Sequence, residues 1–205
     1  MIAIVDYGVG NLFSLTASFR AIGAEVCVTS DAEVIKAADK IILPGVGAFE
    51  DAAKKLRASG IADVICEEAK NGKPLLGICL GMQLLFEKSY EYGEHEGLGL
   101  IPGSVRPIAD VIPKDLKIPH IGWNALCLTG EKNAIFRYIN EGDCVYFVHS
   151  YYATDCDDYI TSCAEYGAPL TASVARGNVY GCQFHPEKSG EVGLSILRAF
   201  VEMEV

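Results

Sequence analysis

The sequence predicts an α/β fold: a three-layer domain whose central sheet is mostly parallel and flanked by helices, with additional antiparallel strands in the second half. Strand and helix patterns alternate along the first 86 residues, which is typical of βαβ units. After about Gly93, glycine and proline become frequent, and short apolar runs with hairpin-length joints replace the alternation. No repeat, low-complexity segment or charged linker interrupts the 205 residues, so we expect a single domain spanning residues 1–205.

The first half supplies the parallel part of the sheet and its covering helices. The predicted strands span residues 1–8, 24–30 and 40–45, and the predicted helices span residues 11–23, 31–38 and, in one or two pieces, 48–72. Asp31 is a suitable N-terminal cap, and Gly60 and Gly72 are a suitable break and a suitable stop. Such alternation builds a parallel sheet that is covered on both faces.

The second half is rich in predicted strands and ends in a helix. The predicted strands span residues 103–108, 144–153, 159–167, 170–177 and 179–184, and the closing amphipathic helix spans residues 190–203.

Composition excludes several classes of function. The net charge of −10, without a run of basic residues, argues against nucleic-acid binding. The longest apolar stretch, residues 74–86, is too short to span a bilayer, and the N-terminus does not resemble a secretory signal. Eight cysteines without a Cys-x-x-Cys pair favour reduced thiols, so we expect a cytoplasmic protein without a membrane partner.

One cysteine stands at a corner that favours reactivity. Residues 74–78 form an apolar run that predicts a buried strand, and residues 82–86 suit a helix. Cys79 lies between them, flanked by Gly77 and Gly81, with the spacing of a Gly-x-nucleophile-x-Gly elbow. A helix that begins just after the thiol also favours thiolate. The alternative is a small buried thiol that fills a tight corner.

A base and an orienting acid follow another predicted strand. His185 and Glu187 are separated by one proline, so a strand end that presents His185 can place Glu187 beside it. Each residue alone is more often structural. Together with Cys79 they form a candidate Cys-His-Glu triad.

The loop of residues 44–47 follows a third predicted strand. Its glycines allow main-chain N–H groups to turn toward a bound carbonyl, so the N–H groups of Gly47 and Leu80 are candidates for an oxyanion hole. An ordinary βα turn is the alternative for this loop.

Other polar positions are weaker candidates. We interpret His95, His120 and His149 as structural. Cysteine and histidine do not occur at zinc spacing, so we expect no metal site, and we also expect no cofactor. Gly8 and Gly10 lack the third glycine of a dinucleotide-binding fingerprint.

The motifs resemble one known family. The segments GICLGMQLLFE and QFHPEKS are similar to the triad-type class I glutamine amidotransferase domain, and the resemblance covers the whole chain. The segments DYGVGN, LPGVGAF, PHIGWN, YFVHSYY and FHPEKS, in this order, are similar to the glutaminase subunits of imidazole glycerol phosphate synthases. Ile121 stands where that family often has methionine, which puts nothing in doubt.

The resemblance implies hydrolysis of L-glutamine to glutamate and ammonia through a thioester on Cys79. It also implies that Gln83 and Glu91 hold the glutamine, with main-chain contacts from Ser150 and Tyr151.

The resemblance further implies a partner. The family delivers its ammonia to a separate (β/α)₈ barrel cyclase subunit, which makes imidazole glycerol phosphate and an aminoimidazole carboxamide ribotide, so we expect a heterodimer. Asn11, Trp123 and Asn124 are the expected contact residues, although Trp123 is equally compatible with a place in the core.

Three rival functions stay open at this stage. The first is a glutaminase subunit of another amidotransferase, such as one for pyridoxal phosphate or anthranilate synthesis. The second is a Cys-His hydrolase or peptidase on a related fold. The third is a binding module without activity, in which Cys79 would be unreactive.

Overall fold

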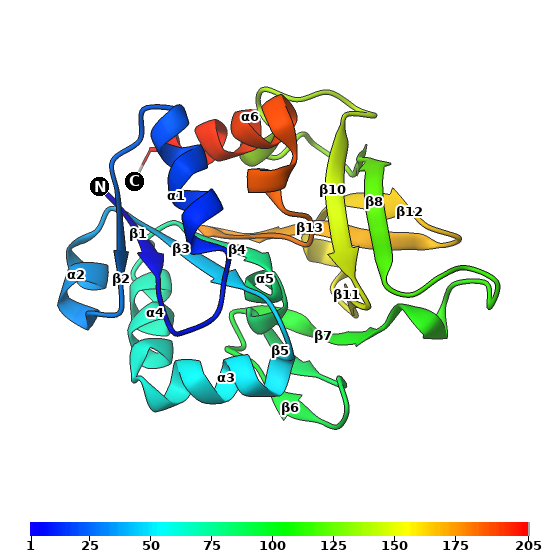
Figure 1. Ribbon diagram of the computed structural model, residues 1–205, viewed down its shortest axis with the longest axis horizontal. Coiled ribbons are helices and arrows are strands. Elements are labelled where there is room, and N and C mark those ends of the chain that lie inside the picture. Colours follow the sequence, from blue (N-terminus) through cyan, green and yellow to red (C-terminus); the bar gives the residue numbers. More distant parts are fainter. Residues whose placement is uncertain (205) are drawn as a thin grey trace.

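The computed structural model describes residues 1–204 and contains one large sheet and two smaller ones (Figure 1). In spatial order, the strands of the large sheet are β2 (Val26–Thr29), β1 (Ile2–Val5), β3 (Lys40–Gly45), β4 (Leu75–Cys79), β14 (Val179–Cys182), β13 (Pro169–Arg176), β12 (Ile160–Glu165) and β9 (Cys127–Leu128). Neighbouring strands from β2 to β14 are parallel, whereas those from β14 to β9 are antiparallel. This arrangement confirms the predicted fold class.

Helices cover both faces of the large sheet. They are α1 (Leu12–Ala21), α2 (Ala32–Ala37), α3 (Phe49–Ala58), α4 (Ile61–Lys70), α5 (Leu80–Leu84) and α6 (Gly190–Val201), with short 3₁₀ helices η1 (Ile108–Asp110), η2 (Ala134–Phe136), η3 (Asp157–Tyr159) and η4 (Pro186–Lys188). Because successive strand residues point to opposite faces, Ile4 packs with α1 and α6, whereas Ala3 and Val5 pack with α2, α3 and α4. Within residues 1–204, no helix has the length and apolar character needed to cross a membrane.

Two smaller sheets stand beside the antiparallel end of the large one. Strands β8 (His120–Ala125) and β10 (Cys144–His149) form a two-stranded antiparallel ribbon, here named the β8–β10 ribbon (Figure 1). The other sheet contains, in spatial order, β11 (Tyr151–Thr154), β7 (Ile101–Pro107), β5 (Phe86–Ser89) and β6 (His95–Glu96).

Most predicted elements of the first half are confirmed. Asp31 caps α2 by accepting a hydrogen bond from the N–H of Glu33 at 2.8 Å. Residues 48–72 form two helices, and Gly60, with φ of +74°, separates them. The predicted helix over residues 82–86 is wrong at its end, because α5 stops at Leu84 and Phe86 begins β5.

The second half differs more from the prediction. The predicted strand over residues 144–153 is two strands, because the chain leaves the β8–β10 ribbon at Ser150 and joins β7 in another sheet. The prediction missed β8, in which only His120 is buried and exposed residues alternate with partly exposed ones, without a run of apolar side chains. It also missed the short strands β5, β6 and β9.

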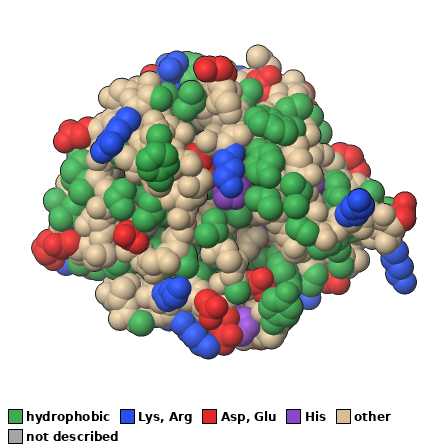
Figure 2. All heavy atoms as spheres, in the orientation of Figure 1, with side chains coloured by type: hydrophobic (Ala, Val, Ile, Leu, Met, Phe, Trp, Pro, Cys, Tyr) green, Lys and Arg blue, Asp and Glu red, His purple; other side chains and the backbone are tan. Residues whose placement is uncertain are grey.

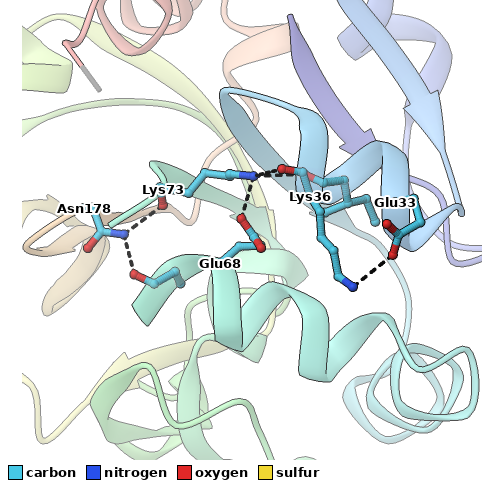
Figure 3. Close-up of polar contacts among 7 residues, drawn as sticks. Glu33, Lys36, Glu68, Lys73 and Asn178 are labelled. Atoms are coloured by element: carbon cyan, nitrogen blue, oxygen red, sulfur yellow. Dashed lines mark hydrogen bonds and ion pairs between the residues drawn. The ribbon is translucent and has the colours of Figure 1, made fainter. Parts of the chain in front are cut away.

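A mostly buried lysine fixes the turn that leads into β4, the strand that ends in Cys79 (Figure 3). The ammonium group of Lys73 lies 2.6 Å from the carboxylate of Glu68 and donates hydrogen bonds to the carbonyls of Ile35 and Lys36 at the end of α2. The amide of Asn178 donates to the carbonyl of Lys73 at 2.8 Å. The turn therefore joins α2, α4 and β14 to the start of β4.

We expect Lys73→Met to lower the free energy of unfolding by about 2 kcal/mol, because it leaves a carboxylate and two carbonyls without their donor. Urea denaturation measures this change. Lys36→Met is the matched control, because the Lys36–Glu33 ion pair is exposed at 41% and 80% of its side chains, against 12% and 14% for Lys73 and Glu68. The prediction fails if both variants unfold at the same urea concentration.

Candidate active site

Close approach of main chains builds the corner at Cys79. A Cβ atom on Gly81 would lie 1.8 Å from the carbonyl oxygen of Leu43, and one on Gly77 would lie 2.7 Å from the carbonyl oxygen of Gly81. Both positions therefore require glycine. Cys79 itself has φ of +55°, a strained value for a residue with a side chain, at the point where β4 ends and α5 begins. The sharp turn directs the thiol toward a pocket instead of the core.

His185 and Glu187 lie together behind the thiol. Nδ1 of His185 is 2.8 Å from Oε1 of Glu187, and both side chains are almost completely buried. Burial alone lowers the pKa of His185, but its interactions with Cys79 and Glu187 outweigh burial and raise this pKa from 6.5 to about 9. The imidazole therefore has the geometry and the proton affinity to exchange a proton with the thiol.

The pocket in front of the thiol brings most of the predicted site together. Its volume is about 510 Å³. Of the predicted site residues, it is lined by Cys79, His185, Gly47, Leu80, Gln83, Glu91, Ser150 and Tyr151. Glu187 lies behind His185, which is the place that an orienting carboxylate requires.

The predicted oxyanion loop is anchored at its start by the sheet, and helix α3 begins two residues after its last glycine. Gly45 pairs with Cys79 in the sheet, and the hydroxyl of Tyr7 donates a 2.8 Å hydrogen bond to the carbonyl of Pro44. Val46 is 40% exposed, and Gly47 has φ of +93° with nothing within 4 Å of an added Cβ. The loop thus passes the elbow at a fixed point and then has room to change its peptide orientation.

Gln83 and Glu91 already hold contacts within the protein. Nε2 of Gln83 donates to Oε1 of Gln183 at 2.9 Å and to the carbonyl of Tyr151 at 3.2 Å, so its oxygen is the atom left for a ligand. A carboxylate oxygen of Glu91 accepts from the N–H of Phe49 at 2.5 Å, and burial raises the pKa of Glu91.

The three predicted partner residues lie in different settings. Trp123 is 56% exposed on the β8–β10 ribbon, so the alternative of a core aromatic is wrong. Asn124, on the same strand, binds His120 through its side chain. Asn11 precedes α1, and its amide lies 3.5 Å from Oε1 of Glu187. Hydrophobic side chains gather over the ribbon beside a hollow near the centre of the face in Figure 2, and Ile121 is also 56% exposed there.

One polar residue beside the thiol was missed at the sequence level. Gln183 is fully buried, and its Nε2 lies 3.8 Å from the sulfur of Cys79. A glutamine in an apolar strand two residues before His185 is a signal that could have found it, because it shares that residue's side of the chain. His149, interpreted from the sequence as structural, lies on the pocket wall and donates through Nδ1 to the carbonyl of Tyr151 at 2.8 Å.

Solved structures share this fold. A crystal structure described as glutamine amidotransferase aligns with a TM-score of 0.76 at 20% identity, covering 98% of each chain. The structure of PurLQS from Thermotoga maritima aligns with a TM-score of 0.74 at 20% identity, covering 97% of this chain and 96% of that one. At these identities the likeness concerns the fold alone.

Relatives found by sequence are much more similar to this chain than these solved structures are, at 49% against 20% identity. A protein of Caldanaerobacter subterraneus subsp. tengcongensis named imidazole glycerol phosphate synthase subunit HisH is 49% identical, covering 99% of this chain and 98% of its own. A protein of Lactococcus lactis subsp. lactis with the same name is also 49% identical, with 98% of both chains covered. The family pattern for glutamine amidotransferase class-I matches residues 3–203. With this match over almost its whole length, the chain belongs to the class-I glutamine amidotransferase family.

Proposed function

We propose that this chain is the glutaminase subunit of imidazole glycerol phosphate synthase in histidine biosynthesis. It hydrolyses L-glutamine to glutamate and ammonia. The observation that carries this proposal is the buried Glu187–His185 pair, whose imidazole lines the same pocket as the thiol of Cys79. The relatives that are 49% identical over nearly the whole chain favour this subunit over other glutaminases and over a peptidase.

The chemistry uses Cys79 twice, first as nucleophile and then as leaving group. Its sulfur attacks the γ-carboxamide carbon, and the N–H groups of Leu80 and Gly47 stabilise the oxyanion. His185 takes the proton of the thiol as the sulfur attacks and gives it to the departing ammonia. It then takes a proton from the water that cleaves the thioester and gives it to the leaving sulfur. Glutamate and the free thiol result, and Glu187 orients the imidazole throughout.

The substrate contacts come from the wall of the pocket. Gln83, Glu91 and the main chain at Ser150 and Tyr151 hold the glutamine, because they line the pocket around the thiol. That these residues line one pocket supports a glutamine site within a single domain, residues 1–205.

The ammonia passes to a (β/α)₈ barrel cyclase subunit in a heterodimer. The contact surface includes Asn11, Trp123 and Asn124, and the exposed indole of Trp123 supports this assignment. We place the protein in the cytoplasm, since all eight cysteines are free thiols.

Replacing Cys79 separates the two half-reactions. In the complex with the cyclase, Cys79→Ala abolishes synthesis from glutamine and leaves synthesis from ammonium salt intact, because the cyclisation belongs to the partner. Cys144→Ala is the control, since this exposed thiol lies away from the pocket and both activities should remain. Loss of both activities in Cys79→Ala would give Cys79 a structural role and contradict the proposal.

The triad predicts how the rate of glutamine hydrolysis depends on pH. Because Cys79 and Glu187 together hold the pKa of His185 near 9, the wild-type rate should fall as pH rises through that value. Glu187→Gln removes the carboxylate, so this alkaline limb should move to lower pH and kcat should drop on the order of 10³-fold. Glutamate release measured from pH 6 to about 10 tests both effects. An unmoved alkaline limb would remove Glu187 from its role.

The open space around Val46 and Gly47 in the loop of residues 44–47 predicts activation by the partner. Peptides at Val46 and Gly47 can turn an N–H toward or away from the thiol, and an oxyanion donor has a large effect on kcat. We therefore expect glutamate release to rise by at least ~100-fold when the cyclase and its nucleotide ligand are added under saturating glutamine. Equal rates for the isolated and the complexed chain would rule out this switch and leave the triad assignment standing.

A further inference from the structure

A chain of hydrogen bonds runs from the β8–β10 ribbon to the wall of the pocket. The side-chain amide of Asn124 donates to the carbonyl of Glu165 at 3.0 Å, and its oxygen lies 2.8 Å from Nε2 of His120. Nδ1 of His120 lies 3.0 Å from Nε2 of His149. Nδ1 of His149 completes the chain at the carbonyl of Tyr151, 2.8 Å away.

The last contact fixes where the hydrogen atoms lie. A carbonyl only accepts, so Nδ1 of His149 carries the hydrogen, and Nε2 of a neutral His149 is an acceptor. His120 must then donate through its own Nδ1. Both rings are buried, and burial lowers the pKa of each, which favours one N–H per ring.

With the hydrogen atoms assigned in this way, the chain of hydrogen bonds lacks one hydrogen at its outer end, between His120 and Asn124. A neutral His120 that donates through Nδ1 presents a bare Nε2 to the oxygen of Asn124, and two acceptors at 2.8 Å repel each other. Rotation of the Asn124 amide by 180° gives Nε2 a donor but turns the amide oxygen toward the carbonyl of Glu165. The contact between Asn124 and Glu165 is exposed, so water can bind both oxygens. Two facing acceptors therefore cost less free energy there than beside the buried His120.

Packing against aromatic rings holds the two imidazoles of this hydrogen-bond chain rigid. The ring of His120 is stacked between those of Phe147 and Tyr166, with centroid distances of 5.0 and 4.2 Å and interplanar angles near 20°. The ring of His149 contacts both His120 and Phe147. Neither imidazole can rotate freely, so a change at Asn124 reaches His149 through fixed partners.

The inner end of the chain leads to the nucleophile. The carbonyl of Tyr151 also accepts from Nε2 of Gln83, which in turn donates to Gln183. Nε2 of Gln183 approaches the sulfur of Cys79 at 3.8 Å. The donor from His149 therefore sets the direction of a carbonyl on which the arrangement of the glutamine pocket depends.

We propose that His149, held by His120 and Asn124, is a positioning residue of the glutamine pocket, where its Nδ1–H orients the carbonyl of Tyr151 and through it Gln83. This inference rests on the proposed glutaminase function. It assigns a role to two histidines outside the triad. It also gives the exposed ribbon a physical link to the substrate site.

Two amide variants of His149 separate positioning from packing. Asparagine places its side-chain nitrogen near the position of Nδ1 and keeps the donor to Tyr151, whereas glutamine places its amide near Nε2 and loses that donor. In the complex with the cyclase, we expect His149→Asn to keep the KM for glutamine within about threefold of wild type. His149→Gln should raise KM at least about tenfold with kcat changed less than threefold, the scale of one hydrogen bond. Equal KM values for the two variants would overturn the proposal.

Nitrogen-15 NMR of the isolated full-length chain tests the hydrogen positions without any activity. We expect His149 to be protonated at Nδ1 only and His120 at Nδ1 only. Asn124→Asp supplies an oxygen that accepts from Nε2 of His120 in every orientation, so His120 should become an imidazolium, whereas Asn124→Leu should leave it neutral. A His149 protonated at Nε2 would overturn the proposal. Wild-type protein that shows the expected tautomers but does not hydrolyse glutamine in the complex would instead overturn the proposed function.

Discussion

The site depends on the contact between the main chains of β3, β4 and α5. Gly81 lies so close to the carbonyl of Leu43 that no side chain fits, and Gly77 lies too close to the carbonyl of Gly81 for a side chain as well. This crossing sets the left-handed backbone of Cys79 and brings Gly45 beside it as its sheet neighbour. The proposed nucleophile and the proposed oxyanion loop thus come together through one steric constraint, and the strain at Cys79 is compensated by the well-packed strands around it.

Parallel pairing then delivers the base. Strand β14 runs beside β4, with Cys182 opposite Ile78, so the chains that leave both strands emerge at the same edge of the sheet. The N–H of His185 donates to the carbonyl of Tyr146, which ties this corner to the β8–β10 ribbon as well. The thiol of Cys79 and the buried carboxylate of Glu187 together keep the pKa of the imidazole high in spite of its burial.

Local pattern was enough to predict the parallel half of the fold and the candidate triad. Period-two and helical spacing mark the first three strands and their helices, and the glycines around Cys79 mark a turn that few other sequences allow. The ribbon was not predictable in this way. The partner of His120 across the ribbon is His149, 29 residues away, and the break at Ser150 depends on which sheet each flanking strand joins. Gln183 and His149 became part of the site only through such distant pairings.

The break at Ser150 explains why the ribbon and the pocket are mechanically connected. Strand β10 pairs only with β8 among the described strands, whereas β11, which begins at Tyr151, pairs with β7 in another sheet. Ser150 is therefore the joint between the two sheets, and both Ser150 and Tyr151 line the pocket. A displacement of the ribbon against the sheet of β7 would have to be absorbed at this joint, since the strands on either side are held by their ladders. A partner that docked on the exposed side chains of the ribbon would thus act on main chain that lines the pocket and lies next to His149.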